Sequence, residues 1–490
     1  MELVNIENDK SKRSNMQDSQ YALLAHYNVI EDNSFSNRII ITSDSPQNLT
    51  KKDDLRFHLE QEVTLVYAEK ADILQALKKH SKKDTGKTTL SMPKYDRKTT
   101  PLSATTSVSP IIGLVNTVIT NAIKNGSSDI HFEPFQDELK VRYRLDGVLR
   151  EINAIPKARM AEVVSRLKIM ANMDIAEKRR PQDGRIRMEY NGSLIDIRVS
   201  TLPTEFGEKV VLRILDKSHL GLDLEKLGFD KSRLETYKKA IKLPYGMILV
   251  TGPTGSGKTT TLYAGLNYIK SPEINISTVE DPIEYNLEGI NQSQVKPEIN
   301  YTFAEAIKTF LRQDPNVIMV GEIRDPETAN IANRAAMTGH LVLSTLHTND
   351  APSAVNRLID LGLAPFQMAS SVSLIVAQRL VRKICQHCRI ERPLTTEQRD
   401  ELRINDNVFS VGEGCDVCGQ TGYKGRIGLY EVMPVSPAIK ELIMNKANAY
   451  DIRLLAVQEG MLGLREDGIV KMKDGITTAA EVLRETRVGL

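Results

Sequence analysis

A glycine-rich segment at residues 251–259 has the composition and spacing of a phosphate-binding loop. It follows the apolar run Met247-Ile248-Leu249-Val250 and precedes the helix-compatible stretch 260–269. Glycines let backbone N–H groups turn inward around phosphate oxygens at the positive end of the next helix. We therefore expect ATP to bind to the backbone and side chains of Gly252, Pro253, Thr254, Gly255, Ser256, Gly257, Lys258, Thr259 and Thr260.

Two of these residues have specific predicted roles. Lys258 is spaced to reach the β- and γ-phosphates, and the hydroxyl of Thr259 is spaced to ligate Mg2+. A glycine-rich turn without a ligand is the alternative. The preceding strand, the glycines, the lysine and the threonine together argue against it.

Carboxylates follow two more apolar runs that are typical of buried parallel strands. Glu280, Asp281 and Glu284 come after residues 276–279, and Glu322 comes after residues 317–320 and a glycine. Side chains at the carboxyl ends of parallel strands point into the ligand crevice. Glu322 is the predicted residue that orients the attacking water, and the other three are candidates for metal, water or substrate-orienting roles. A Walker B strand would end in Asp where this chain has Gly321, so the direct Mg2+ partner stays open.

Two histidines and two arginines are further candidates. His347 follows the apolar run 341–345 and could donate a hydrogen bond to the γ-phosphate, whereas His340 is equally compatible with a turn or a subunit contact. Arg198 and Arg213 lie in strand-like runs upstream of the loop. Structural ion pairs or a solvated strand face would explain them. Arginines from a neighbouring domain can also neutralise the charge that develops during phosphoryl transfer.

The four cysteines form two CxxC pairs, Cys385 with Cys388 and Cys415 with Cys418. Four thiolates can converge on Zn2+ in a closed, structural site. Redox chemistry is the alternative, but neither pair has a thioredoxin-like context. Basic residues near the pairs form either a solvated face or a surface for acidic lipid or an acidic partner: Arg379, Arg382, Lys383, Arg389, Lys424 and Arg426.

Composition restricts the remaining functions. Charged residues make up 26% of the 490 residues and nearly cancel to a net charge of +2, so bulk charge does not favour a nucleic-acid binder. No apolar run approaches the ~18 residues of a membrane span, and the N-terminus lacks a signal-peptide core. We therefore expect a cytoplasmic protein, any membrane association of which is through partners or surface charge.

Residues 108–488 resemble the secretion ATPases of type II secretion and type IV pilus assembly systems. The resemblance rests on the phosphate loop, the four cysteines and seven further segments: 128–134, 142–147, 181–185, 280–284, 321–325, 338–340 and 344–349. It implies an α/β chain with a RecA-like P-loop NTPase core. In that family a PAS-like α+β domain precedes the core, and a four-cysteine zinc module and a helical C-terminal region follow it.

The resemblance also implies roles for individual residues. Residues 280–284 match the aspartate box, Glu322 matches the Walker B glutamate, and His340 and His347 match the histidine box. Arg198 and Arg213 match arginines that the preceding domain contributes to the nucleotide site. The expected parts are a docking domain (1–80), a flexible linker (81–107), the PAS-like domain (108–216), a second linker (217–228), the ATPase core (229–381), the zinc module (382–431) and the helical domain (432–490).

In function, the resemblance implies a homohexameric ATPase motor that drives pilus or pseudopilus assembly. Its expected partners are an inner-membrane platform protein and a membrane-anchored docking protein, with no nucleic acid. The choice between a secretion and a pilus system stays open. A nucleotide-gated scaffold with little turnover is the main alternative, and a DNA-translocating relative is a weaker one.

Overall fold

The structure is a computed structural model that describes residues 29–32, 38–42, 63–67, 100–101, 110–215, 222–405 and 408–487. The chain divides into two compact units, Met1–Lys94 and Tyr95–Leu490. In the first unit, β1 (Val29–Asp32) pairs antiparallel with β2 (Arg38–Thr42), which pairs parallel with β3 (Val63–Tyr67). Most of the expected docking domain (1–80) and of the expected linker (81–107) lies outside the described residues.

The second unit begins with a seven-stranded sheet in the order β4-β8-β9-β10-β5-β6-β7. Its strands from β8 to β7 pair antiparallel. Asp146 and Gly147 both have positive φ and connect β6 to β7 in a tight hairpin turn. The elements are β4 (Thr100–Pro101), α4 (Pro110–Lys124), β5 (Asp129–Pro134), β6 (Glu138–Leu145), β7 (Val148–Pro156), α5 (Lys157–Met170), β8 (Gln182–Tyr190), β9 (Ser193–Thr204) and β10 (Gly207–Leu215).

A second seven-stranded sheet forms the centre of this unit, in the order β13-β12-β14-β15-β11-β16-β19. Its strands are parallel from β13 to β16, and β19 is antiparallel to β16. Parallel neighbours end at the same edge, so the segments that follow them lie close together. The strands are β11 (Gly246–Thr251), β12 (Ile276–Glu280), β13 (Asn291–Gln294), β14 (Val317–Val320), β15 (Leu341–Leu346), β16 (Val372–Ile384) and β19 (Tyr423–Pro434).

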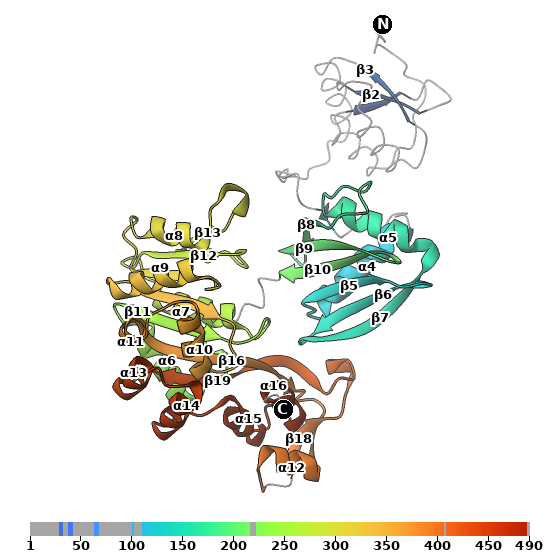
Figure 1. Ribbon diagram of the computed structural model, residues 1–490. Coiled ribbons are helices and arrows are strands. Elements are labelled where there is room, and N and C mark those ends of the chain that lie inside the picture. The colour runs from blue at the N-terminus through green and yellow to red at the C-terminus, as the bar shows by residue number, and fades with distance from the viewer. Residues whose placement is uncertain are drawn as a thin grey trace, which may run out of the picture. The chain divides into compact units, whose positions relative to one another are not determined.

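Helices cover both faces of this central sheet (Figure 1). Along β11, Met247 and Leu249 pack into one hydrophobic cluster, and Ile248 and Val250 pack into another. Because successive strand side chains point to opposite faces, this strand is buried on both sides, and its unbroken apolar sequence follows from that. One layer contains η2 (Leu224–Lys226), α6 (Lys231–Ala240) and α7 (Lys258–Ile269), and the other contains α8 (Phe303–Phe310), α9 (Pro326–Met337), α10 (Ala351–Asp360), α11 (Pro365–Ser371), α13 (Pro437–Met444) and α14 (Ala449–Gln458).

Two helices that follow central strands begin on aspartate caps. Asp325 accepts a hydrogen bond from the N–H of Thr328 at the start of α9, and Asp350 accepts one from Ser353 at the start of α10. Such caps satisfy backbone donors that the first helical turn leaves unpaired. They fix where the segments at residues 321–325 and 347–350 end.

The cysteine pairs lie in an insertion between β16 and β19. The insertion contains β17 (Arg389–Pro393), α12 (Thr396–Leu402), β18 (Val408–Gly412) and η4 (Asp416–Cys418). The expected boundaries at 381/382 and 431/432 fall inside β16 and β19, which pair along most of their length. The chain ends with α15 (Leu464–Lys473) and α16 (Ala479–Thr486). None of the described helices is long and apolar enough to cross a membrane.

Candidate functional site

The segment between β11 and α7 has the geometry of a closed phosphate loop. Gly252, Gly255 and Gly257 have φ values of +150°, +80° and +88°, which L side chains rarely adopt. A Cβ on Gly252 would lie 2.5 Å from the carbonyl oxygen of Gln378. Positive φ and close backbone approach therefore both require glycine at that position.

The amino group of Lys258 is folded against this loop. Its Nζ donates to the carbonyl oxygens of Gly252 at 2.8 Å and Pro253 at 3.0 Å. Burial lowers the pKa of Lys258 to about 8. The amino group therefore lies at the mouth of the loop with no carboxylate bound to it.

A cavity of about 820 Å³ opens beside the loop. It brings together most of the residues predicted from the sequence: the loop residues 253–260, Glu280, Asp281, Glu284, Glu322, His347 and Arg213. Three predicted residues do not line it: Gly252, His340 and Arg198. The Nδ1 of His340 lies 3.0 Å from the carbonyl oxygen of Ala335 at the end of α9, and Arg198 contacts the segment after β12 instead.

Glu322 lies between two cationic or ionisable side chains. Its carboxylate pairs with Arg324, and it lies 3.4 Å from Nε2 of His347. The side chain of Glu322 is 14% exposed, so it is shielded but reachable from the cavity. At Gly321, a Cβ would lie 3.3 Å from the carbonyl oxygen of Val279, so a larger residue would crowd β12.

Glu280 is already saturated with internal hydrogen bonds. It accepts from Thr278 at 2.7 Å, from Gln292 at 3.0 Å and from the hydroxyl of Tyr263. Burial and the nearby carboxylate raise the pKa of Tyr263, which keeps that phenol a donor. Among the acidic residues 280–284, Asp281 is thus the most available to a ligand.

The two predicted arginines occupy different surroundings. Arg213 donates from Nε to Asp129 at 3.1 Å and lines the cavity, with 57% of its side chain exposed. Arg198 donates to the carbonyl oxygen of Ile283 at 2.5 Å and lies 3.4 Å from the carboxylate of Glu284. Each therefore forms the structural ion pair that sequence reasoning offered as the alternative, while Arg213 also faces the cavity.

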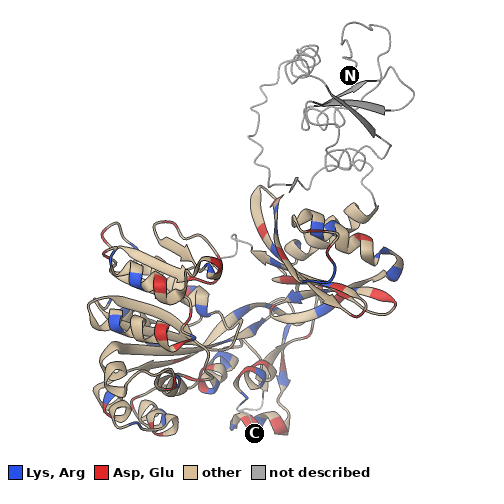
Figure 2. Cartoon of the chain, turned by 45° about the horizontal axis from the view of Figure 1, so that its top comes forward, with Lys and Arg blue, Asp and Glu red and all other residues tan. Residues whose placement is uncertain are grey.

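The structure corrects the proposed basic patch around the cysteines. Arg379 is only 8% exposed and lines the nucleotide cavity, because β16 is the parallel neighbour of β11. Arg382 pairs with Glu481 and lies 4.0 Å from the ring centre of Tyr423. Neither is available to a lipid surface. In Figure 2, Lys and Arg positions and Asp and Glu positions are interspersed along the described elements.

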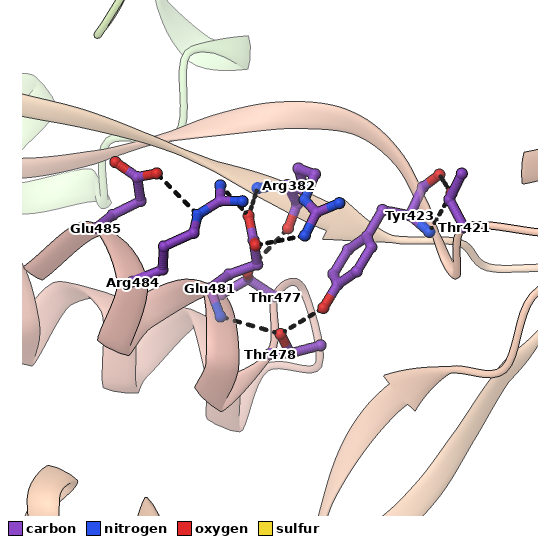
Figure 3. A network of polar contacts seen from close by, with 8 residues as sticks. All are labelled: Arg382, Thr421, Tyr423, Thr477, Thr478, Glu481, Arg484 and Glu485. Carbon is purple, nitrogen blue, oxygen red and sulfur yellow. Dashed lines mark hydrogen bonds and ion pairs between the residues drawn. The ribbon is translucent and has the colours of Figure 1, made fainter. Parts of the chain in front are cut away.

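Sequence reasoning also missed a contribution from the C-terminal helix. The buried carboxylate of Glu481 on α16 accepts from Arg382 at 2.7 Å and from Arg484 at 2.8 Å (Figure 3). This network places Arg484 and Glu485 on the lining of the nucleotide cavity. No local pattern in residues 478–486 signals this contact, because its partner Arg382 lies far away in the sequence, on β16.

The cysteines converge in the way a tetrahedral metal requires. The Sγ atoms all lie within 4.8 Å of one another, with three pairs at 3.7, 3.8 and 3.9 Å. Four sulfurs at ~2.3 Å from one zinc would be ~3.8 Å apart. Burial opposes ionisation of Cys418, but the N–H groups of Cys415 and Gly422 outweigh it and lower the pKa of Cys418 to about 6, whereas burial raises the pKa of Cys388 to about 12. The convergence of the four sulfurs is the observation that fits a metal ion.

The strand, loop and helix around Lys258, with Glu322 facing the same cavity, define a P-loop ATPase. Residues 104–484 match the family model described as Type II/IV secretion system protein. The chain belongs to this family of secretion ATPases.

Named relatives come from both pilus and secretion systems. The chain is 44% identical over 479 residues to the type IV pilus assembly ATPase PilB of Myxococcus xanthus (strain DK1622), covering 94% of this chain and 84% of that protein. It is 48% identical to the type II secretion system ATPase E of Vibrio cholerae (serotype O1, El Tor Inaba N16961), covering 77% of this chain and 76% of that protein. Among solved structures it is similar to the pilus retraction motor PilT with bound ADP, with 25% identity and a TM-score of 0.52, covering 76% of this chain and 96% of that one.

Proposed function

We propose that this chain is the motor of a pilus or type II secretion machine and uses ATP hydrolysis to move its own domains. The observation that carries this proposal is that Lys258 and Glu322 line one cavity. They lie in the segments that follow β11 and β14 of the same sheet. Relatives named as assembly and secretion ATPases support the same role. A phosphate-binding cation and a water-orienting carboxylate are the two groups that hydrolysis needs most.

The contacts of the loop suggest an order of events on binding. Lys258 exchanges the carbonyl oxygens of Gly252 and Pro253 for phosphate oxygens, whose negative charge favours the charged form of its amino group. Glu322, held by Arg324 and His347, then orients water toward the γ-phosphate. Arg213 lies on the cavity lining where it can offset the charge that develops on the phosphoryl group.

Mg2+ fits oxygen ligands that this site offers. Thr259, whose side chain is exposed, and Asp281 both line the cavity. We assign the metal to them, since Glu280 already accepts three internal hydrogen bonds. When bound, the ion neutralises charge on the β- and γ-phosphates.

The same proposal assigns identities to the domains, the cysteine cluster, the oligomer and its partners. The sheet β11–β16 is the RecA-like core, and residues 108–216 are a PAS-like domain that supplies Arg198 and Arg213. The four cysteines hold one structural Zn2+. A homohexamer at the cytoplasmic side of the inner membrane works against a platform protein, and residues 1–80 meet a membrane-anchored docking protein. His340 and His347 act together as a histidine pair across that assembly.

A scaffold that binds ATP without turnover is the second candidate. It needs Lys258 but not Glu322. A comparison of phosphate release and ATP binding in the same variants therefore separates the two functions.

We expect Glu322→Gln to lower phosphate release by about 10²-fold or more while ATP affinity changes little, because the amide cannot accept a proton from water. Glu298→Gln is the matched control, since Glu298 is exposed in the short helix Pro297–Ile299. Equal rates for the wild type and Glu322→Gln would overturn the motor and favour the scaffold.

A further inference from the structure

Four Lys or Arg residues are buried among the residues that the structure describes: Lys168, Lys258, Arg379 and Lys471. Two of them have carboxylate partners, since Lys168 lies 2.5 Å from Glu208 and Lys471 pairs with Asp467. A buried charge without an opposite charge is costly, so such pairing is the rule. Lys258 and Arg379 are the two exceptions within the described part of the chain.

Both exceptions line the same cavity. Lys258 is the phosphate-loop lysine, whose missing counter-charge is the nucleotide itself. Arg379 comes from β16, the strand next to β11, and its charge is near enough to contribute to the lowered pKa of Lys258. The unliganded site thus concentrates two buried cations with no carboxylate bonded to either.

Arg379 is held in place by neutral oxygens only. Its Nη1 donates to the carbonyl oxygen of Gln378 at 3.1 Å, and its Nη2 donates to the carbonyl oxygen of Asn349 at 2.9 Å and to the side-chain oxygen of Asn349 at 3.4 Å. These bonds orient the guanidinium without neutralising it. The group is therefore positioned before a ligand arrives.

The guanidinium also lies against the phosphate loop. A Cβ built on Gly252 would be 3.3 Å from Nη1 of Arg379 and 2.7 Å from the hydroxyl of Ser256. That Ser256 hydroxyl is buried and has no hydrogen-bond partner. The carboxylates of Glu485, Glu431 and Asp350 attract Arg379 from a distance, but none forms an ion pair with it. A donor with no acceptor and a cation with no bonded carboxylate at one glycine both point to an anionic, oxygen-rich ligand.

We propose that Arg379 binds the phosphate groups of the nucleotide, as a second cation supplied by the same subunit as Lys258. This inference rests on the proposed function and deepens it. A planar guanidinium can make two parallel hydrogen bonds to phosphate oxygens, which a lysine cannot. Because its other bonds reach Asn349, Arg379 also ties the bound phosphate to the segment that follows His347.

Equilibrium titration calorimetry of the full chain with ATP and with inorganic tripolyphosphate tests the proposal. We expect Arg379→Gln to weaken both ligands by about tenfold or more, and Arg379→Lys to weaken them less. Lys383→Gln, an exposed cation on the same strand, is the control and should leave both affinities unchanged. The melting temperature of ligand-free Arg379→Gln should equal or exceed that of the wild type, because an unpaired buried charge is removed.

Unchanged ATP affinity in Arg379→Gln would overturn the inference. So would weaker ATP binding with unchanged tripolyphosphate binding, which would place Arg379 at the nucleoside, or a lower melting temperature with weakened binding, which would make it a structural clamp. Normal ATP binding without phosphate release in the wild type would defeat the proposed motor and leave this inference standing. A wild type that binds no ATP would overturn both.

Discussion

The carboxylate of Glu322 lies 3.4 Å from Nε2 of His347, although the two residues follow different strands. Their strands β14 and β15 are parallel neighbours, with Val320 opposite Ser344. The hydroxyls of Ser344 and Thr345 also donate to the carbonyl oxygens of Val320 and Gly321, each at 2.7 Å. These hydrogen bonds hold the two strand ends together. A change in the position of Glu322 therefore also changes the surroundings of His347.

We predict that His347→Ala lowers the rate of ATP hydrolysis by about tenfold to 10²-fold, because Glu322 loses a partner that orients it. Steady-state phosphate release measures this effect. The variant with both Glu322→Gln and His347→Ala should be no slower than Glu322→Gln alone, since the two residues act as one unit. Additive losses in the double variant would contradict a shared role.

We predict that the protein binds one Zn2+ per chain and that Cys415→Ser with Cys418→Ser abolishes this binding. Metal content by mass spectrometry measures the stoichiometry. Hydrogen exchange should then rise between residues 385 and 422, because metal binding and local folding are coupled. Strand β19 should stay protected and ATP should still bind, because β19 pairs with β16 inside the central sheet.

His387→Ala is the matched control for zinc, because this residue lies between two of the cysteines and the four Sγ atoms already converge without it. Its metal content should equal that of the wild type. Loss of zinc in His387→Ala would mean that an imidazole replaces one of the thiolates.

We predict that Glu481→Ala destabilises the protein by about 3–5 kcal/mol, because it leaves the half-buried guanidinium of Arg382 without its carboxylate partner. Thermal unfolding, monitored with and without ATP, measures the loss. Glu485→Gln should cost less than ~1 kcal/mol, because Glu485 pairs with Arg484 at a more exposed position. Equal losses of stability in the two variants would show that Glu481 contributes no more to the network in Figure 3 than Glu485 does.

We predict that the domain built on the first seven-stranded sheet, which contains β5, loses stability as pH falls below about 6.5, the ordinary pKa of histidine. Burial lowers the pKa of His131, so in this range the unfolded chain binds a proton that the folded chain does not. The groups around its ring are Glu133, Asp129, Arg144 and Lys209. Stability from His131 is therefore complete above the unfolded pKa and declines toward the lowered folded pKa.

Calorimetric melting of the wild type and His131→Gln at pH 7.5 and 5.5 tests this pH dependence. The wild type should lose more melting temperature between the two conditions. Glu133 contributes only at lower pH: burial opposes ionisation there, but Arg142 and Lys209 together hold its pKa below the usual value. The same pH slope in both proteins would contradict the assignment to His131.

The sequence was sufficient for the parts of the site that are local. The phosphate loop is specified within nine residues, since glycine conformation, lysine and strand are adjacent in the chain. The carboxylates after β12 and β14 were found because parallel strands end at one edge. The four cysteines were found because their spacing is itself the signal.

The parts that depend on strand order could not be found this way. Arg379 looked like a surface cation beside the cysteines, and only the pairing of β16 with β11 places it against Gly252. Arg382 and Glu481 meet across about a hundred positions of sequence, a distance over which periodicity carries no information. Likewise, the expected boundary between the zinc module and the helical domain at 431/432 gave no sign that β19 is an edge strand of the central sheet.

Strand β16 carries Gln378 and Arg379 at the phosphate loop and ends at Ile384, directly before Cys385. The six residue steps of extended chain from Arg379 to Cys385 span roughly 20 Å. The strand therefore joins the phosphate loop to the four-cysteine cluster through one continuous run of backbone, paired with β11 on one side and with β19 on the other. The cluster is thus anchored to the same strand that supports the loop.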